Sequence, residues 1–260
     1  MHDLQIIPIP AFEDNYIWLI HNNKQAIVVD PGDAEPVLAT LAKLKLTLDT
    51  ILITHHHHDH IDGVPELLKL HPKTRVYAPT LENYPFRHIP VSETTQHQPT
   101  ALNINFSVLD CAGHTRDHIA YYAKLDDGTH WLFSGDVIFA AGCGFVPEGY
   151  YTQAYQALQK IAALPPQTQI FCTHEYTLSN IQFALTIEPN NEKLQYRLIA
   201  SQQTRSLAQP TLPTNLKLEL ETNPYLRCNN HQVISALHAE TSDEVSIFTE
   251  IRKLKNKYNS

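Results

Sequence analysis

The sequence lacks the features of several special classes of protein. Its 27 acidic residues against 19 lysines and arginines give a net charge of -8, which argues against a surface built to neutralise nucleic-acid phosphates. No apolar run approaches the ~18 residues of a membrane span. The start of the chain, Met1 to Gln5, lacks the basic-then-apolar order of a secretory signal. We therefore expect a cytoplasmic protein that binds neither nucleic acid nor membrane, and we further expect a monomer.

Cysteine and glycine are also scarce. The four cysteines, at positions 111, 143, 172 and 228, form no Cys-x-x-Cys pair, so we expect small, buried, reduced thiols and no disulfide framework. The eight glycines all lie at or before Gly149. Tight loops around a sheet need glycine, whereas helices need little of it. This predicts a sheet-rich domain over residues 1–174 and a helical domain over residues 175–260.

Histidine, in contrast, is abundant: there are 16, and five of them lie between His55 and His60. This box follows an apolar run that suits a strand and precedes a segment with helical spacing. His55 and His57, two apart in an extended segment, can face one centre, and Asp59 and His60 can face a second. Imidazole and carboxylate are usual ligands of zinc and related ions. The box therefore predicts a metal site; an expression tag would lie at a terminus and would not carry the aspartate.

The apolar patterns predict many strands with interspersed helices up to residue 174, and helices after it. Residues 80–100, rich in proline and polar groups, are expected to form a loop. A capping box, Thr241-x-x-Glu244, is expected to open the last helix. The expected strands are 4–8, 16–20, 26–29, 50–53, 75–78, 104–109, 119–125, 130–133 and 169–172, and the expected helices are 34–44, 61–70, 152–164, 178–187 and 191–207.

The His-x-His-x-Asp-His box after a strand resembles the signature of the metallo-β-lactamase superfamily, and nearly the whole chain is similar to glyoxalase II, the hydroxyacylglutathione hydrolases. The box alone would fit dozens of chemistries, whereas an ordered set of segments is more specific. The resemblance implies an α/β fold, a four-layer αββα sandwich with a C-terminal all-helical domain. The other segments that carry it are Gly113-His114-Thr115, Phe133-Ser134-Gly135-Asp136, Ala141-Gly142-Cys143-Gly144, Glu148-Gly149, Thr173-His174-Glu175-Tyr176 and Arg252-Lys253-Leu254-Lys255.

The resemblance also implies a binuclear metal site. Zinc is the first choice for the two ions, and iron and manganese are admissible for nitrogen and oxygen ligands. His56 and His58, which alternate with the ligands, should point elsewhere, and Asp117 stands where the family usually has glycine. The implied ligands are His55, His57 and His114 for the first ion, Asp59, His60 and His174 for the second, and Asp136 bridging both.

The implied activity is hydrolysis of S-(2-hydroxyacyl)glutathione, typically S-D-lactoylglutathione, to glutathione and D-lactate, the second step of methylglyoxal detoxification. A metal-bound hydroxide would be the nucleophile, so no side chain is assigned as catalytic. The leaving thiolate, whose thiol has a pKa of about 8.5, hardly needs a general acid. Alternatives are a persulfide dioxygenase-like enzyme with one iron, whose chains generally lack the helical appendage, and a hydrolase of another thioester. A nuclease is disfavoured by the acidic charge, and a simple metal buffer by ligands dispersed along the chain.

The substrate-binding residues implied by the resemblance are Tyr176, Arg252 and Lys255. Cations at a helix C-terminus are also favoured by the helix dipole alone. The sequence departs from the family at Phe145, where lysine or arginine is usual, and at Pro147, where an aromatic residue is common. One charge-assisted hydrogen bond, worth ~1.5–3 kcal/mol, is then missing, which predicts weak glutathione binding or a preference for another thioester.

Overall fold

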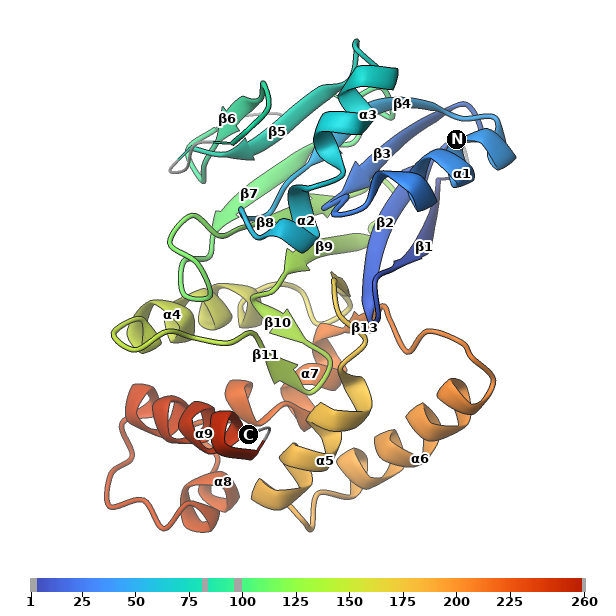
Figure 1. The fold of residues 1–260 in the computed structure, drawn as a ribbon. Helices are drawn as coiled ribbons and strands as arrows, with labels where there is room; N and C mark the ends of the chain where they lie inside the picture. Colours follow the sequence, from blue (N-terminus) through green and yellow to red (C-terminus); the bar gives the residue numbers. More distant parts are fainter. Residues whose placement is uncertain (1–3, 81–83, 96–99, 259–260) are drawn as a thin grey trace. The chain divides into compact units, whose positions relative to one another are not determined.

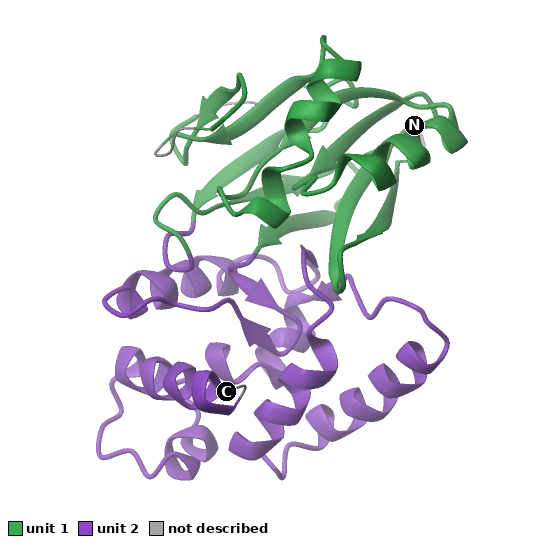
Figure 2. Ribbon diagram, in the orientation of Figure 1, with its two compact units in different colours: residues 1–110, 115–135 green, residues 111–114, 136–260 purple. Residues whose placement is uncertain are grey.

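The computed structural model describes residues 4–80, 84–95 and 100–258. The chain forms two compact units (Figure 2): unit 1 contains residues 1–110 and 115–135, and unit 2 contains residues 111–114 and 136–260. Within the described residues no helix is long and apolar enough to cross a membrane.

Unit 1 is built on a six-stranded sheet with neighbouring strands in chain order (Figure 1). The first three strands pair antiparallel and the remaining pairs are parallel. Helices α1 (Ala34–Leu44) and α3 (Val64–Leu70) cover one face, because their buried Val37, Leu41, Val64 and Leu67 join one apolar cluster with alternate strand residues. The strands are β1 (Gln5–Ala11), β2 (Asn15–His21), β3 (Gln25–Val29), β4 (Thr47–Leu52), β5 (Arg75–Pro79) and β6 (Ile89–Val91).

A second, antiparallel sheet in unit 1 contains β7 (Phe106–Asp110), β8 (Ile119–Lys124) and β9 (His130–Gly135). Tyr121 on β8 is fully buried, and its hydroxyl lies 3.1 Å from the Ile53 carbonyl and 3.2 Å from that of Tyr77. Since Tyr77 belongs to β5, this side chain ties the two sheets together. Unit 1 therefore has a helix layer on one sheet and a second sheet on the other face.

Unit 2 is mostly helical. Its strands form two short antiparallel pairs, β10 (Ile138–Phe139) with β11 (Gly142–Cys143) and β12 (Gln169–Cys172) with β13 (Thr214–Asn215). Ile181, Ala184 and Leu194 form a small core with Ala141 between the first two helices after β12. The helices are α4 (Tyr151–Ala162), α5 (Thr177–Ile187), α6 (Glu192–Ser206), α7 (Leu216–Thr222), the 3-10 turn η1 (Pro224–Leu226), α8 (His231–Ala236) and α9 (Glu244–Tyr258).

Three details differ from the sequence-based expectations. Strand β6 lies in the segment expected to be a loop; residues 81–83 and 96–99 of that segment are outside the described part. β13 lies in a region expected to be all helical. The cap of α9 is Asp243, whose carboxylate accepts from the Ser246 N–H at 2.9 Å, while Thr241 accepts from the Asp243 N–H. The predicted capping box is therefore wrong, because a nearer aspartate takes that role.

Candidate metal centre and adjoining cavity

The histidine box begins directly after β4, and its second half forms the short helix α2 (His58–Ile61). The turn after β3 lies against it. A Cβ at Gly32 would fall 1.9 Å from the Asp59 carbonyl oxygen, so only glycine allows this approach. Asp30, at the start of the turn, has a left-handed φ of 51° and is 2% exposed. The turn thus brings a buried carboxylate next to the box.

Asp30 sets the orientation of two histidines. Its carboxylate accepts from the Thr54 N–H at 2.8 Å, the Thr54 hydroxyl at 2.7 Å and the His60 Nδ1–H at 3.0 Å. Because the Thr54 hydroxyl donates to Asp30, it can only accept from His55 Nδ1, which lies 3.1 Å away. Both rings therefore carry the proton on Nδ1 and present Nε2 as a ligand atom, because metal-bound histidine usually donates its other ring N–H to an acceptor that fixes the ring.

Unit 1 brings four of the predicted ligands together. His55 Nε2 lies 3.1 Å from His57 Nδ1, and His60 Nε2 lies 3.4 Å from Asp59 Oδ2. The buried Asn15 donates to the same Asp59 oxygen at 2.9 Å and fixes the carboxylate.

Unit 2 brings the other three predicted ligands together. Asp136 Oδ2 lies 3.5 Å from His114 Nε2 and 3.4 Å from His174 Nε2. His114 Nδ1 donates to the Phe145 carbonyl at 2.8 Å, which leaves Nε2 toward Asp136. A Cβ at Gly144 would lie 2.0 Å from the Asp136 carbonyl oxygen, so this close approach also requires glycine.

These distances fit divalent metal ions. Two ligand atoms bound tetrahedrally at about 2.0–2.1 Å from one ion lie about 3.3 Å apart. The ligand pairs within each unit are separated by 3.1 to 3.5 Å. Each of the seven predicted ligands, four in unit 1 and three in unit 2, offers a nitrogen or oxygen atom that could bind a metal ion. The donor set contains imidazole nitrogen and carboxylate oxygen, the set of a divalent metal site.

The remaining histidines of the box point elsewhere, as predicted. His56 Nδ1 lies 2.8 Å from the Asp117 carboxylate, and the exposed His58 pairs with Asp62. Asp117 also accepts from Tyr84 and Thr115. The carboxylate at position 117, where the resemblance leads one to expect glycine, thus has three nearby partners.

The predicted burial of the cysteines is also confirmed. Burial raises the pKa of the Cys143 and Cys172 thiols, so both stay protonated.

The three predicted substrate residues line one cavity of about 610 Å³ in unit 2. The Tyr176 ring stacks on His174 with centroids 4.7 Å apart and an interplanar angle of 3°. Arg252 is buried and donates Nη1 to the carbonyls of Cys143 and Gly144 at 3.0 and 3.2 Å. Phe145, 56% exposed, lines the same cavity. The cavity therefore lies next to His174, a predicted metal ligand, through Tyr176, and it is also lined by the cations Arg252 and Lys255.

Lys255 is the unusual group of this cavity. The residue is 5% exposed, and its ammonium has no hydrogen-bond partner among the described residues. It lies 5.3 Å from the centre of the Phe183 ring and 5.4 Å from that of Tyr258. Burial, with a smaller contribution from the positive Arg252, lowers the pKa of Lys255 to about 8. An anion entering the cavity would supply the partner that this ammonium lacks.

Sequence reasoning missed the groups that hold the ligands. Asp30 was recognisable only as part of an Asp-Pro-Gly turn, and no signal in the sequence identifies Asn15 or the Phe145 carbonyl as partners of a ligand. These contacts join residues that are between 30 and 44 positions apart.

Comparison with known proteins adds family matches over nearly the whole chain. Residues 11–174 match the model of the metallo-beta-lactamase superfamily, and residues 175–258 match that of the hydroxyacylglutathione hydrolase C-terminus. Two similar relatives are the hydroxyacylglutathione hydrolases of Methylobacillus flagellatus and Vibrio parahaemolyticus. Each is 46% identical to this chain, and the alignments cover 98% of it and 99% and 100% of the relatives.

Solved structures are similar in fold at lower identity. The BLEG-1 B3 metallo-beta-lactamase has a TM-score of 0.60 at 22% identity, covering 86% of this chain and 99% of its own. A metallo-beta-lactamase from Staphylococcus aureus has a TM-score of 0.63 at 19% identity, covering 98% and 72%. Together with the family models, these likenesses confirm the predicted fold class.

Proposed function

The chain belongs to the hydroxyacylglutathione hydrolase family of the metallo-β-lactamase superfamily, and from this we propose that it hydrolyses S-(2-hydroxyacyl)glutathione, S-D-lactoylglutathione above all, to glutathione and a 2-hydroxy acid. The observation that carries the proposal is the contact between His174 and Tyr176, since Tyr176 also lines the cavity with Arg252 and Lys255. A thioester with a carboxylate at its far end has the two features that such a site can recognise. The resulting D-lactate would complete methylglyoxal detoxification.

The proposed site holds two divalent ions, zinc first, with iron and manganese as alternatives. The proposed ligands are nitrogen and oxygen atoms with no thiolate, a set that suits all three ions. Two bound ions would lower the pKa of a shared water and polarise the thioester carbonyl. The proposed ligands are His55, His57 and His114 for one ion, Asp59, His60 and His174 for the other, and Asp136 for both.

The side chains have distinct proposed tasks. Asp59, held by Asn15, orients the attacking water. Tyr176 offers its ring to the thiol-bearing part of glutathione, and Arg252 and Lys255 attract a terminal carboxylate. Hydroxide, formed when the bound water releases a proton to solvent, would add to the carbonyl carbon as the carbon–sulfur bond breaks. Glutathione would leave as a thiolate without a general acid, because the pKa of its thiol is about 8.5, and the carboxylic acid formed would release the second proton.

The proposal extends to the organisation of the chain. We assign residues 1–174 to a catalytic domain and residues 175–260 to a substrate-binding domain; the matched family models meet between residues 174 and 175 and support this boundary. We also propose a cytoplasmic monomer with a small-molecule partner.

The deciding experiment measures steady-state hydrolysis of S-D-lactoylglutathione and the metal content of the same sample. Ready turnover with about two ions per chain is expected. His57→Ala should lose metal and activity, whereas His58→Ala, which removes a side chain that is 92% exposed, should retain both. Two ions without turnover would redirect the search to other thioesters. One iron with oxygen uptake on glutathione persulfide would replace hydrolysis by the dioxygenase alternative.

A further inference from the structure

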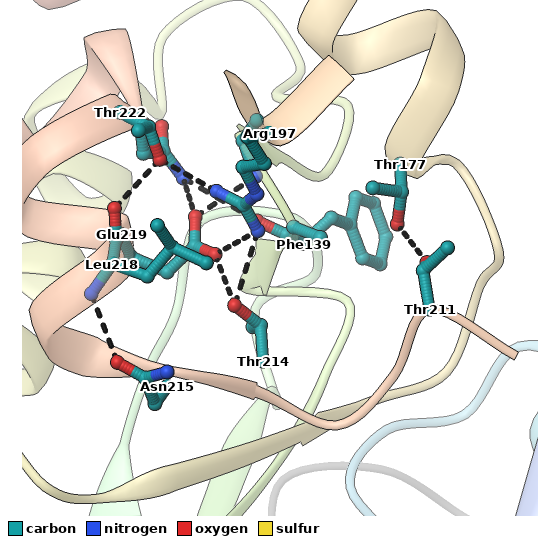
Figure 3. Close-up of polar contacts among 12 residues, drawn as sticks. Phe139, Thr177, Arg197, Thr211, Thr214, Asn215, Leu218, Glu219 and Thr222 are labelled. Carbon is teal, nitrogen blue, oxygen red and sulfur yellow. Dashed lines mark hydrogen bonds and ion pairs between the residues drawn. The ribbon is translucent and has the colours of Figure 1, made fainter. Parts of the chain in front are cut away.

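A fully buried carboxylate, Glu219 on α7, receives hydrogen bonds on both oxygens (Figure 3). Oε1 accepts from Arg197 Nη2 and the Thr214 hydroxyl, each at 2.5 Å. Oε2 accepts from the Ala141 N–H at 2.8 Å and from Asn223 Nδ2 at 3.1 Å. One side of the carboxylate is thus an ion pair with α6, and the other side holds a backbone N–H of the β10–β11 turn.

The β10–β11 turn depends on these helices for its polar contacts. Asn223 Nδ2 also lies within hydrogen-bond distance of the carbonyls of Phe139 and Gly142, at 3.3 and 2.9 Å. Asn180 on α5 donates to the Ala140 carbonyl at 3.2 Å. Ala141 has a φ of 56°, a left-handed conformation that a non-glycine residue keeps only when its surroundings fix it. The hydrogen bonds that Glu219, Asn223 and Asn180 make with the turn supply that constraint.

The same hairpin carries groups of the candidate metal centre. Asp136 lies two residues before β10, and the Phe139 ring makes edge contacts with His174 and Tyr176, with centroids 5.6 and 5.3 Å away. After β11 the chain continues to Phe145, whose carbonyl accepts from His114. Each predicted ligand in unit 2 is therefore tied to this hairpin: Asp136 precedes it in the chain, His174 contacts Phe139 within it, and His114 bonds to Phe145 after it.

We propose that Glu219 is a positioning residue of the metal centre: by accepting from Ala141 it holds the β10–β11 hairpin, and the hairpin places Asp136 and the surroundings of His114 and His174. This inference rests on the proposed metal-dependent function. It differs from a purely structural ion pair because the pair with Arg197 uses Oε1 alone, whereas the hairpin is held by Oε2. Loss of the Oε2 contact should change the metal site even where the fold survives.

Glu219→Gln tests the proposal. An amide has one acceptor oxygen, so its NH₂ group must face either the Arg197 and Thr214 donors or the Ala141 and Asn223 donors. The matched control is Thr222→Val, which removes a hydroxyl that accepts from Arg197 Nη1 at 2.6 Å but leaves the hairpin contacts in place. Metal affinity is measured by competition with a chromophoric chelator, and the ligand geometry by the visible spectrum of the cobalt-substituted protein.

We expect Glu219→Gln to weaken metal affinity by up to about 10-fold, the lower end of the range for residues that hold a metal ligand directly, because Glu219 acts through the hairpin. It should also alter the cobalt spectrum and lower kcat more than it raises KM. Thr222→Val should keep the affinity and spectrum of the wild type. Equal metal affinity in all three proteins would overturn the proposal, as would equal losses in both variants.

Should Glu219→Gln not fold, Asn180→Ala, which removes the neutral hydrogen bond to the Ala140 carbonyl, should weaken metal affinity in the same direction. Because these readouts need no substrate, failure to hydrolyse glutathione thioesters would leave them interpretable.

Discussion

Replacing Lys255 by methionine should make the protein more stable and its substrate binding weaker. A pKa of about 8 in place of 10.5 means that burial, together with the positive Arg252, disfavours the charged side chain by about 3 kcal/mol. Contacts of the ammonium with the Phe183 and Tyr258 rings offset about 0.5–1 kcal/mol each. The methionine variant should therefore gain about 1–2 kcal/mol in the free energy of unfolding at pH 7. Loss of a charge-assisted bond to the substrate should raise KM about 10- to 100-fold.

Both the stability advantage of the Lys255→Met variant and the KM of the wild type should depend on pH. The folded-state pKa of Lys255 is lower than the unfolded value, so between pH 8 and 10.5 the unfolded chain binds more protons and the wild type gains stability as pH rises. Below pH 8 the full penalty is present. The advantage of the variant should thus be constant below pH 8 and should shrink above it. Because an anion prefers the protonated amine, the KM of the wild type should rise above pH 8, and that of the variant should lack this rise.

Urea unfolding from pH 6.5 to 9.5 and initial rates over the same range measure the two quantities. Lys253→Met is the control, because this substitution removes the same charge from the same helix at an exposed position. It should change neither quantity appreciably. If Lys255→Met had a wild-type KM, Lys255 would have no role in substrate binding. A variant less stable than the wild type at pH 7 would refute the assigned burial penalty.

Further predictions concern the substrate loop and the metal ligands. Phe145→Arg should lower KM for a glutathione thioester about 10-fold or more with little change in kcat, by adding a charge-assisted bond worth ~1.5–3 kcal/mol; Phe145→Leu is the control, and an unchanged KM in the arginine variant would contradict the role assigned to this position. Asp30→Asn should weaken metal affinity about 10- to 100-fold, because an amide cannot accept all three bonds that Asp30 receives; Asp62→Asn should have no such effect. Removal of metal by a chelator should lower the melting temperature of the wild type, because bound metal stabilises the folded state by mass action, and restored zinc should reverse the shift.

The ligand box was predictable because its information is local. Four of its six consecutive residues face a common region as soon as a strand runs into a helix. The isolated ligands His114, Asp136 and His174 could be assigned only through the ordered set of family segments, since one histidine after a strand has many structural roles. The partners of the ligands were not predictable at all. Glu219 lies 78 residues from Ala141, and nothing in the local sequence relates a glutamate on a short helix to a distant turn.

Position 145 shows how a family pattern can change without loss of the metal centre. The backbone carbonyl of Phe145 orients His114, a role that any residue can fill, while the side chain projects into the cavity. The preceding carbonyls of Cys143 and Gly144 are held by Arg252, so the path of this loop does not depend on a cation at position 145. Substitution of a cation by phenylalanine can therefore alter substrate affinity and leave the orientation of the ligand intact. It follows that the metal affinity of Phe145→Arg should equal that of the wild type even where KM changes, and a coupled change in both would show that the side chain also shapes the loop.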